Sequence, residues 1–216
     1  MVTSDTLTWQ ETMNTVTVDC CMDIRIHPSK DSKTILLLIP GVDGSVDGFE
    51  NKYVTIAEAN QKKHCVAVVR ISNPFISSFH WESNVRHILD YIEVNKKEVC
   101  GNETYDLYIQ AHSAGASVAA VIAYKYDAIK RLLLINIAMG LNTAGIIEGI
   151  KRFSGEVTLL IGDKDPSLQS AKQIQFSETS QNAQIVIAKN ADHDFSGDSF
   201  PIFLEAANKY LFKGSS

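Results

Sequence analysis

Residues 105–126 read YDLYIQAHSAGASVAAVIAYKY, which has the form of a strand, a sharp turn and a helix with Ser113 at the apex. The alternation of residues 105–110 is typical of a short strand, and the alanine-rich run after the turn indicates a helix. Small residues flank the serine, because Ala111 precedes it by two positions and Gly115 follows it by two. Such neighbours let a strand and a helix approach closely.

The rest of the chain alternates strand-like and helix-like segments. Residues 7–13 and 15–26 alternate apolar and polar side chains around Asn14, which indicates an antiparallel hairpin at a sheet edge. Residues 33–39 form an apolar run typical of a buried parallel strand. Further strands are expected at 64–71, 132–138, 157–161 and 185–189, and helices at 48–63, 80–99, 143–153, 167–179 and 200–212. This alternation predicts an α/β fold, a mainly parallel central sheet with helices on both faces.

Length and charge narrow the class of protein. The 216 residues contain no linker rich in proline, glycine or serine, so we expect a single domain spanning residues 1–216. A net charge of -5 without basic blocks argues against nucleic acid and anionic membranes as partners.

The cellular location is inferred from the N-terminus and the cysteines. The first ten residues show no secretory signal, and the apolar runs are too short to span a bilayer. Cys20, Cys21, Cys65 and Cys100 have no C-x-x-C spacing, and the adjacent pair cannot both point the same way on a strand. Reduced thiols in a cytoplasmic protein are the expectation.

Three loops that follow predicted strands carry reactive side chains. Ligands of such sheets bind beyond the carboxyl ends of the strands, so these loops are expected to meet at one site. Residues 40–45 read PGVDGS, residues 162–166 read GDKDP, and residues 190–195 read NADHDF. Each has an ordinary alternative: a glycine-rich turn, an aspartate that caps the next helix, and a solvated loop histidine.

The AHSAG sequence resembles the nucleophile elbow of the α/β-hydrolase family, whose usual pattern is G-x-S-x-G. Ala111 stands in place of the first glycine. The resemblance implies an α/β-hydrolase fold in which Ser113 is the nucleophile, His193 the general base and Asp165 the acidic member of the triad, with Asp163 as the alternative acid. Serine, aspartate and histidine occur in this family's chain order, each in an expected loop.

The loop at residues 40–45 looks like the P-G-x-D-G variant of some esterases and thioesterases in this family. By that resemblance, the oxyanion hole is formed by the backbone N–H groups of Ala114 and Val42, with Asp43 N–H as the alternative to Val42. Residues 139–156 leave room for one short helix but not for a cap domain, so we expect an open site. Its walls are expected to include Asp43, Phe75 and Met139. An aromatic residue there, such as Phe75, either binds an acyl chain or only covers the core.

The sequence therefore predicts a serine hydrolase that cleaves a carboxylic ester or thioester through a Ser-His-Asp triad and an acyl-enzyme intermediate. No metal and no cofactor are expected, and the partner is a small-molecule acyl substrate. Two alternatives stay open: a serine peptidase or acyltransferase that uses the same triad, and a noncatalytic binding protein with the same fold. The physiological substrate and the oligomeric state do not follow from the sequence.

Overall fold

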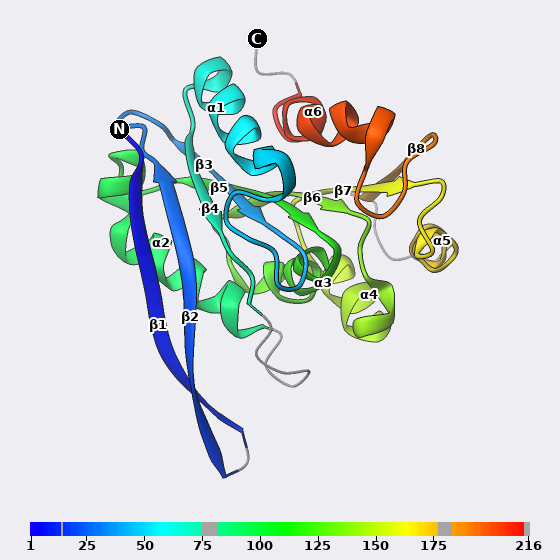
Figure 1. The fold of residues 1–216 in the computed structure, drawn as a ribbon, viewed down its shortest axis with the longest axis horizontal. Coiled ribbons are helices and arrows are strands. Elements are labelled where there is room, and N and C mark those ends of the chain that lie inside the picture. The colour runs from blue at the N-terminus through cyan, green and yellow to red at the C-terminus, as the bar shows by residue number, and fades with distance from the viewer. Residues whose placement is uncertain (14, 75–81, 177–182, 214–216) are drawn as a thin grey trace.

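The computed structural model describes residues 1–13, 15–74, 82–176 and 183–213. These residues contain one eight-stranded sheet with six α-helices around it (Figure 1). The strands are β1 (Thr3–Met13), β2 (Val16–His27), β3 (Thr34–Ile39), β4 (Ala67–Ile71), β5 (Asp106–His112), β6 (Ile129–Ile135), β7 (Glu156–Gly162) and β8 (Ala183–Ala188). The helices are α1 (Lys52–His64), α2 (Ser83–Cys100), α3 (Ser113–Ile122), α4 (Thr143–Arg152), α5 (Leu168–Phe176) and α6 (Phe200–Tyr210).

The sheet order is β1-β2-β4-β3-β5-β6-β7-β8. β1 pairs with β2 and β2 with β4 in antiparallel fashion, and all other neighbours are parallel. The predicted α/β architecture, including the edge hairpin, is therefore confirmed. Asn14 and residues 177–179, which were expected to form the hairpin turn and the end of a helix, lie outside the described residues.

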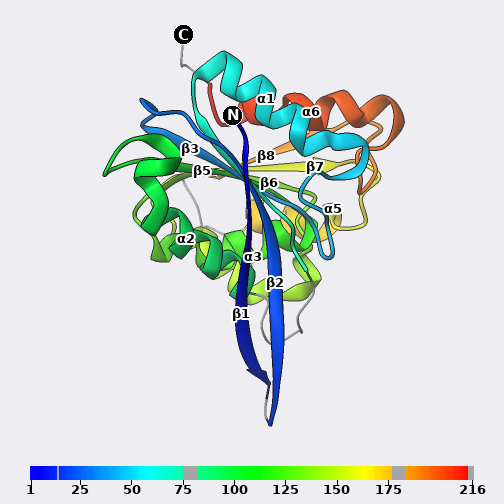
Figure 2. The ribbon, with the colours of Figure 1, turned by 60° about the vertical axis from the view of Figure 1, so that its left-hand side comes forward.

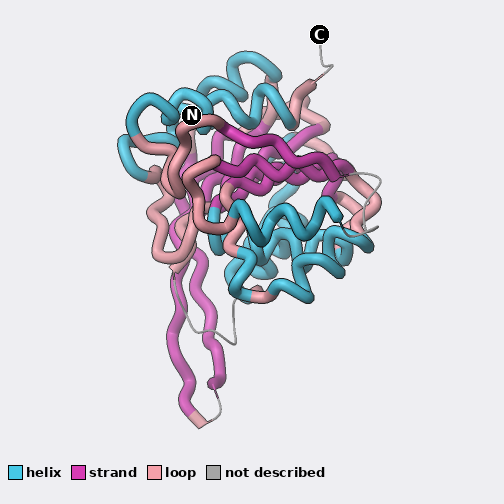
Figure 3. The backbone as a smooth tube through the Cα atoms, turned by 90° about the vertical axis from the view of Figure 1, so that its right-hand side faces the viewer, coloured by secondary structure: helices cyan, strands magenta, loops and turns pink. Residues whose placement is uncertain are grey.

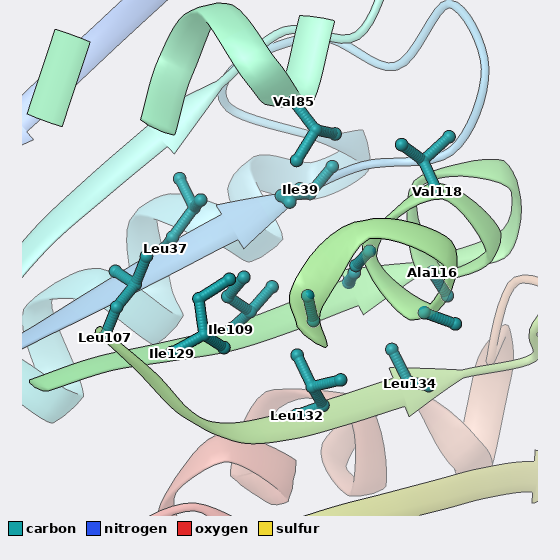
Figure 4. Close-up of a cluster of buried hydrophobic side chains, with 14 of the residues drawn as sticks. Leu37, Ile39, Val85, Leu107, Ile109, Ala116, Val118, Ile129, Leu132 and Leu134 are labelled. Atoms are coloured by element: carbon teal, nitrogen blue, oxygen red, sulfur yellow. The ribbon is translucent and has the colours of Figure 1, made fainter. Parts of the chain in front are cut away.

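Helices cover both faces of the sheet (Figures 1 and 3). α1 and α6 lie together on one face, and α2, α3 and α4 lie on the other. Successive strand side chains point to opposite faces, so Leu37 and Ile39 join the cluster under α3 while Leu36 and Leu38 join the cluster under α1 and α6. Figure 4 shows the first cluster, in which Ala116 of α3 lies over the side chains of β3, β5 and β6.

The β1–β2 hairpin extends well beyond the rest of the sheet (Figure 2). β2 pairs with β4 only over residues 24–27, whereas its pairing with β1 runs along the whole hairpin. Hydrogen bonds tie the hairpin to α2, among them one from Trp9 Nε1 to Ser83 Oγ at 3.1 Å and one from the Tyr91 hydroxyl to Asp5 Oδ2 at 2.8 Å. Cys20 is buried and Cys21 is exposed, so these adjacent cysteines point in different directions, as the sequence predicts.

α3 approaches the end of β3 so closely that one position in it must lack a side chain. A Cβ on Gly115 would lie 2.3 Å from the backbone oxygen of Pro40 and 2.7 Å from Ile39 Cγ2. Real Cβ atoms do not approach backbone atoms that closely, so the glycine lets the helix sit directly against the strand end. At the other side of the turn Ala111 is fully buried, so an alanine methyl is accommodated there.

We predict that Gly115→Ala lowers the free energy of unfolding by about 1–3 kcal/mol, the usual effect of overpacking, although alanine is the better helix former. Urea titration measures the change. Gly140→Ala is the matched control, because a Cβ at Gly140 meets nothing within 4 Å. Equal stability of the two variants would show that the approach of α3 to β3 tolerates a methyl group.

Candidate active site

Ser113 lies where β5 ends and α3 begins, and its backbone is left-handed, with φ of 53°. A serine in this region is strained, and the strain is maintained by the packed strand on one side and helix on the other. The loop after β3 faces the serine at close range. A Cβ on Gly41 would lie 3.2 Å from Ser113 Cβ and 3.6 Å from its Oγ.

The structure brings Ser113, His193 and Asp165 into direct contact. His193 Nε2 lies 2.9 Å from Ser113 Oγ, and His193 Nδ1 lies 2.5 Å from Asp165 Oδ2. The three residues come from the loops after β5, β7 and β8, at the carboxyl edge of the sheet. Asp163, the alternative acid, is exposed, and within the described ranges it makes no hydrogen bond to His193.

Asp165 uses its two carboxylate oxygens for different purposes. Oδ1 accepts hydrogen bonds from the backbone N–H of Ser167, at 2.6 Å, and from the Ser167 hydroxyl, just before α5 begins. Oδ2 faces His193. The side chain has no exposed surface, while that of His193 is 39% exposed. The same carboxylate therefore holds Ser167, the residue directly before α5, and contacts the imidazole of His193.

Two backbone N–H groups beside Ser113 remain available as donors. Ala114 is in the first turn of α3, where backbone N–H groups have no acceptor within the helix. No described residue accepts a hydrogen bond from the Val42 N–H, whereas the Asp43 N–H donates to the Asn73 oxygen at 2.8 Å. The geometry therefore favours Val42 over Asp43 as the partner of Ala114.

A cavity of about 320 Å³ opens beside Ser113, and its walls differ from those expected. Asp43 is exposed but does not line this cavity, and Met139 is only 1% exposed because it packs in the main hydrophobic cluster. The prediction that these two side chains form walls of the site is therefore wrong for the cavity at Ser113. Phe75 lies outside the described residues. The cavity is lined by Pro40, Gly41, Val42, Gly44, Ser45, Gly48, Phe49, Lys52, Tyr53, His112, Ser113, His193 and Asp194.

A buried asparagine, Asn136, holds the histidine loop in place. Its Nδ2 donates to the backbone oxygens of Asp192 and His193 at 2.9 and 2.8 Å, and its Oδ1 accepts from the Gly162 N–H at 2.8 Å. Asn136 has φ of 45°, which ends β6 at Ile135, three residues before the predicted strand end. The sequence signal for this role is a single asparagine inside the otherwise apolar run LLLINIA, residues 132–138, which was assigned only to a strand.

A second asparagine, Asn73, fixes the loop after β3. Its Nδ2 donates to the backbone oxygens of Pro40 at 3.0 Å and Gly41 at 3.3 Å, and its own backbone pairs with Gly44 and Asp43. These bonds orient the loop that carries the Val42 N–H.

His112, the residue before the serine, is buried below the site. Its Nε2 donates to the backbone oxygen of His193 at 2.9 Å. Burial, with a smaller contribution from the nearby positive charge of Lys52, lowers the pKa of His112 to about 4. The ring is therefore neutral near pH 7 and acts as a fixed support for the loop of His193.

Within residues 1–13, 15–74, 82–176 and 183–213, no group of three or more His, Cys, Asp or Glu side chains is arranged to hold a metal ion. None of the helices in these ranges has the length and apolar character needed to cross a membrane.

Comparison with solved structures identifies the fold. Est1E from Butyrivibrio proteoclasticus superposes with a TM-score of 0.69 at 15% identity, over 95% of this chain and 98% of that chain. The peroxisomal alpha-beta-hydrolase Lpx1 from Saccharomyces cerevisiae gives 0.72 at 12% identity, over 99% and 89%. Alpha/beta hydrolase domain-containing protein 10 from mouse gives 0.65 at 15% identity, over 97% and 100%. No protein-family model matches the sequence, and neither does any curated protein sequence.

The chain thus has the α/β-hydrolase fold. It is a minimal version of this fold. The connection between β6 and β7, where the sequence predicts no cap domain, contains α4 and a short 3₁₀ helix, Met139–Leu141.

We predict that Asn136→Ala lowers the free energy of unfolding by about 3 kcal/mol, because it leaves the Gly162 N–H without an acceptor and removes two further hydrogen bonds. Asn142→Ala is the control. Asn142 lies in the same connection but only caps α4, through a 2.9 Å bond from the Gly145 N–H, and its loss is expected to cost about 1 kcal/mol. Chemical denaturation of both variants checks the difference, and an Asn136 variant as stable as the control would contradict the tie between the loops.

Proposed function

We propose that the protein is a serine hydrolase that cleaves a carboxylic ester or thioester through an acyl-enzyme intermediate. The observation that carries the proposal is the unbroken contact from the Ser113 hydroxyl through the His193 imidazole to the Asp165 carboxylate. A serine hydroxyl is a weak nucleophile at neutral pH, and this arrangement is what activates it.

The mechanism follows from these contacts. His193 Nε2 accepts the proton of Ser113 Oγ as the oxygen attacks the substrate carbonyl. Asp165 accepts a hydrogen bond from Nδ1–H, which leaves Nε2 free as the base and stabilises the imidazolium. The protonated imidazole then gives its proton to the departing alcohol or thiol. Water, deprotonated by the same imidazole, attacks the acyl group and releases the acid, and the proton returns to Ser113.

The oxyanion of the tetrahedral intermediate is assigned to the N–H groups of Ala114 and Val42. Each such donor contributes on the order of 3 kcal/mol to transition-state stabilisation. Asn73 and Gly41 support this assignment, since the first anchors the loop and the second allows its backbone to approach Ser113.

Proteins with similar folds support the hydrolysis of esters as a class of reaction. One of them is an esterase domain from Rhodothermus marinus, and Est1E from Butyrivibrio proteoclasticus has been solved with ferulic acid bound. We extend ester cleavage, with no metal or cofactor and a small-molecule acyl substrate, to this chain. The four free cysteines fit a cytoplasmic location, where thiols stay reduced.

Labelling with a fluorophosphonate probe tests the nucleophile. The wild-type protein is expected to react at Ser113, as located by peptide mass spectrometry, and Ser113→Ala is expected to lose all labelling while keeping its circular dichroism spectrum. Ser117→Ala is the control, because Ser117 lies one turn further along α3 and is buried. Equal labelling of Ser113→Ala and wild type would refute the proposal.

Substitution of the two neighbouring aspartates tests the acid. Asp165→Asn is expected to lower kcat on short p-nitrophenyl esters by about 10³ to 10⁴-fold, because the amide favours the wrong imidazole tautomer. Asp163→Asn is expected to leave kcat within about twofold, since Asp163 is exposed and makes no hydrogen bond to His193 in the described part of the chain. The reverse pattern would assign the role to Asp163.

A further inference from the structure

Lys52 is a buried lysine in the wall of the cavity at Ser113. It is the first residue of α1, only 7% of its surface is exposed, and it lines the cavity that contains Ser113 and His193. Its Nζ lies 4.4 Å from the ring centre of Phe203 and 5.5 Å from that of Tyr53. In Figure 1 the start of α1 is the end nearest the loops at the carboxyl edge of the sheet.

The ammonium group of Lys52 has no anionic partner in contact. Among the described residues, none forms a salt bridge or a hydrogen bond with its Nζ. Arg70, a cation buried to a similar degree, is fully engaged: it contacts Asp47 at 2.5 Å and the Val46 oxygen at 3.2 Å, and its Nε lies 3.3 Å from His27 Nε2. Buried charges are normally paired in this way, so the unpaired lysine stands out.

Two features of the position of Lys52 disfavour its charged form. Burial lowers its pKa, and the start of a helix carries partial positive charge that repels a cation. Asp194 acts in the opposite direction and favours the charged form, without forming an ion pair within 4 Å. Where a residue breaks the rules of local stability, a function that needs it there is the usual reason.

The surroundings of Lys52 point to a ligand. Lys52 and Asp194 also line a second cavity, of about 530 Å³, so they stand where the two cavities adjoin. Tyr53, the next residue and another wall of the cavity at Ser113, has a buried hydroxyl without a hydrogen-bond partner among the described residues. Unpaired buried polar groups at the wall of a cavity are often satisfied by a bound molecule.

We propose that Lys52 is the anion-binding group of the substrate cleft, so that the ester or thioester cleaved at Ser113 carries a carboxylate close to its scissile carbonyl. This inference rests on the proposed function and adds the class of substrate. The ammonium would donate charge-assisted hydrogen bonds to the carboxylate, and the small size of the cavity at Ser113 keeps the two ends of the ligand close together.

Two matched substrate pairs test the proposal and show whether the carboxylate of the substrate belongs to the acyl chain or to the leaving group. The first compares the mono-4-nitrophenyl ester of adipic acid with 4-nitrophenyl hexanoate, and places the carboxylate on the acyl chain. The second compares 3-carboxyphenyl acetate with phenyl acetate, and places it on the leaving group. The measured quantity is the ratio of kcat/KM for the anionic ester to that for the neutral ester.

We expect the wild-type enzyme to prefer the anionic member of one pair, and Lys52→Met to lower that ratio by at least about tenfold, mainly through KM. Lys52→Arg is expected to retain part of the preference, because it keeps the charge. Lys62→Met is the control, since Lys62 is exposed at the far end of the same helix and should leave the ratio unchanged.

Thermal denaturation provides a second readout. Removal of an unpaired buried charge should leave the melting temperature of Lys52→Met equal to or above that of wild type. A clear fall, together with equal losses on both esters of each pair, would show that Lys52 is structural and would overturn the proposal.

The outcomes separate this inference from the proposed function. Labelling of Ser113 and hydrolysis of neutral esters without any preference for an anionic ester would overturn the role of Lys52 alone. Absence of both labelling and hydrolysis would overturn the proposed function, and with it this inference.

Discussion

The close approach of the β3 loop, the β5 end and the start of α3 is the constraint on which the site depends. It holds Ser113 in a left-handed conformation that costs an L-residue about 1–2 kcal/mol, and it does so by leaving no side chain at Gly115 and Gly41. A strained turn persists only where its surroundings determine it completely. Here a strand on one side and a helix on the other do so, and the hydroxyl is left at the edge of the sheet facing His193.

Two buried asparagines extend this order to the loops around the serine. Asn73 holds the loop that carries the Val42 N–H, and Asn136 ties the end of β7 to the loop after β8. Backbone groups in irregular loops lack the partners that strands and helices provide, so side-chain amides, which both donate and accept, are well suited to fix them. The geometry at His193 thus depends on residues that touch no reacting atom.

The sequence indicated the architecture well because strand and helix periodicity is local, and it placed Ser113, Asp165 and His193 in loops that the parallel topology brings together. It was less informative about the walls of the site. Met139 lies in the core and Asp43 outside the cavity, because side-chain direction in a loop depends on packing that no local pattern encodes. Lys52 was missed for a related reason, since a lysine in a polar helix looks like a solvated charge until the fold buries it.

The fold places few constraints on the identity of the residues in the projecting half of the β1–β2 hairpin. β2 pairs with β4 only over residues 24–27. Side chains near the tip, such as that of Val16, are exposed and belong to neither hydrophobic cluster. Positions of this kind are free to drift during evolution and accept insertions without disturbing the core. That ribbon is therefore a natural attachment point for a fluorophore or an affinity tag.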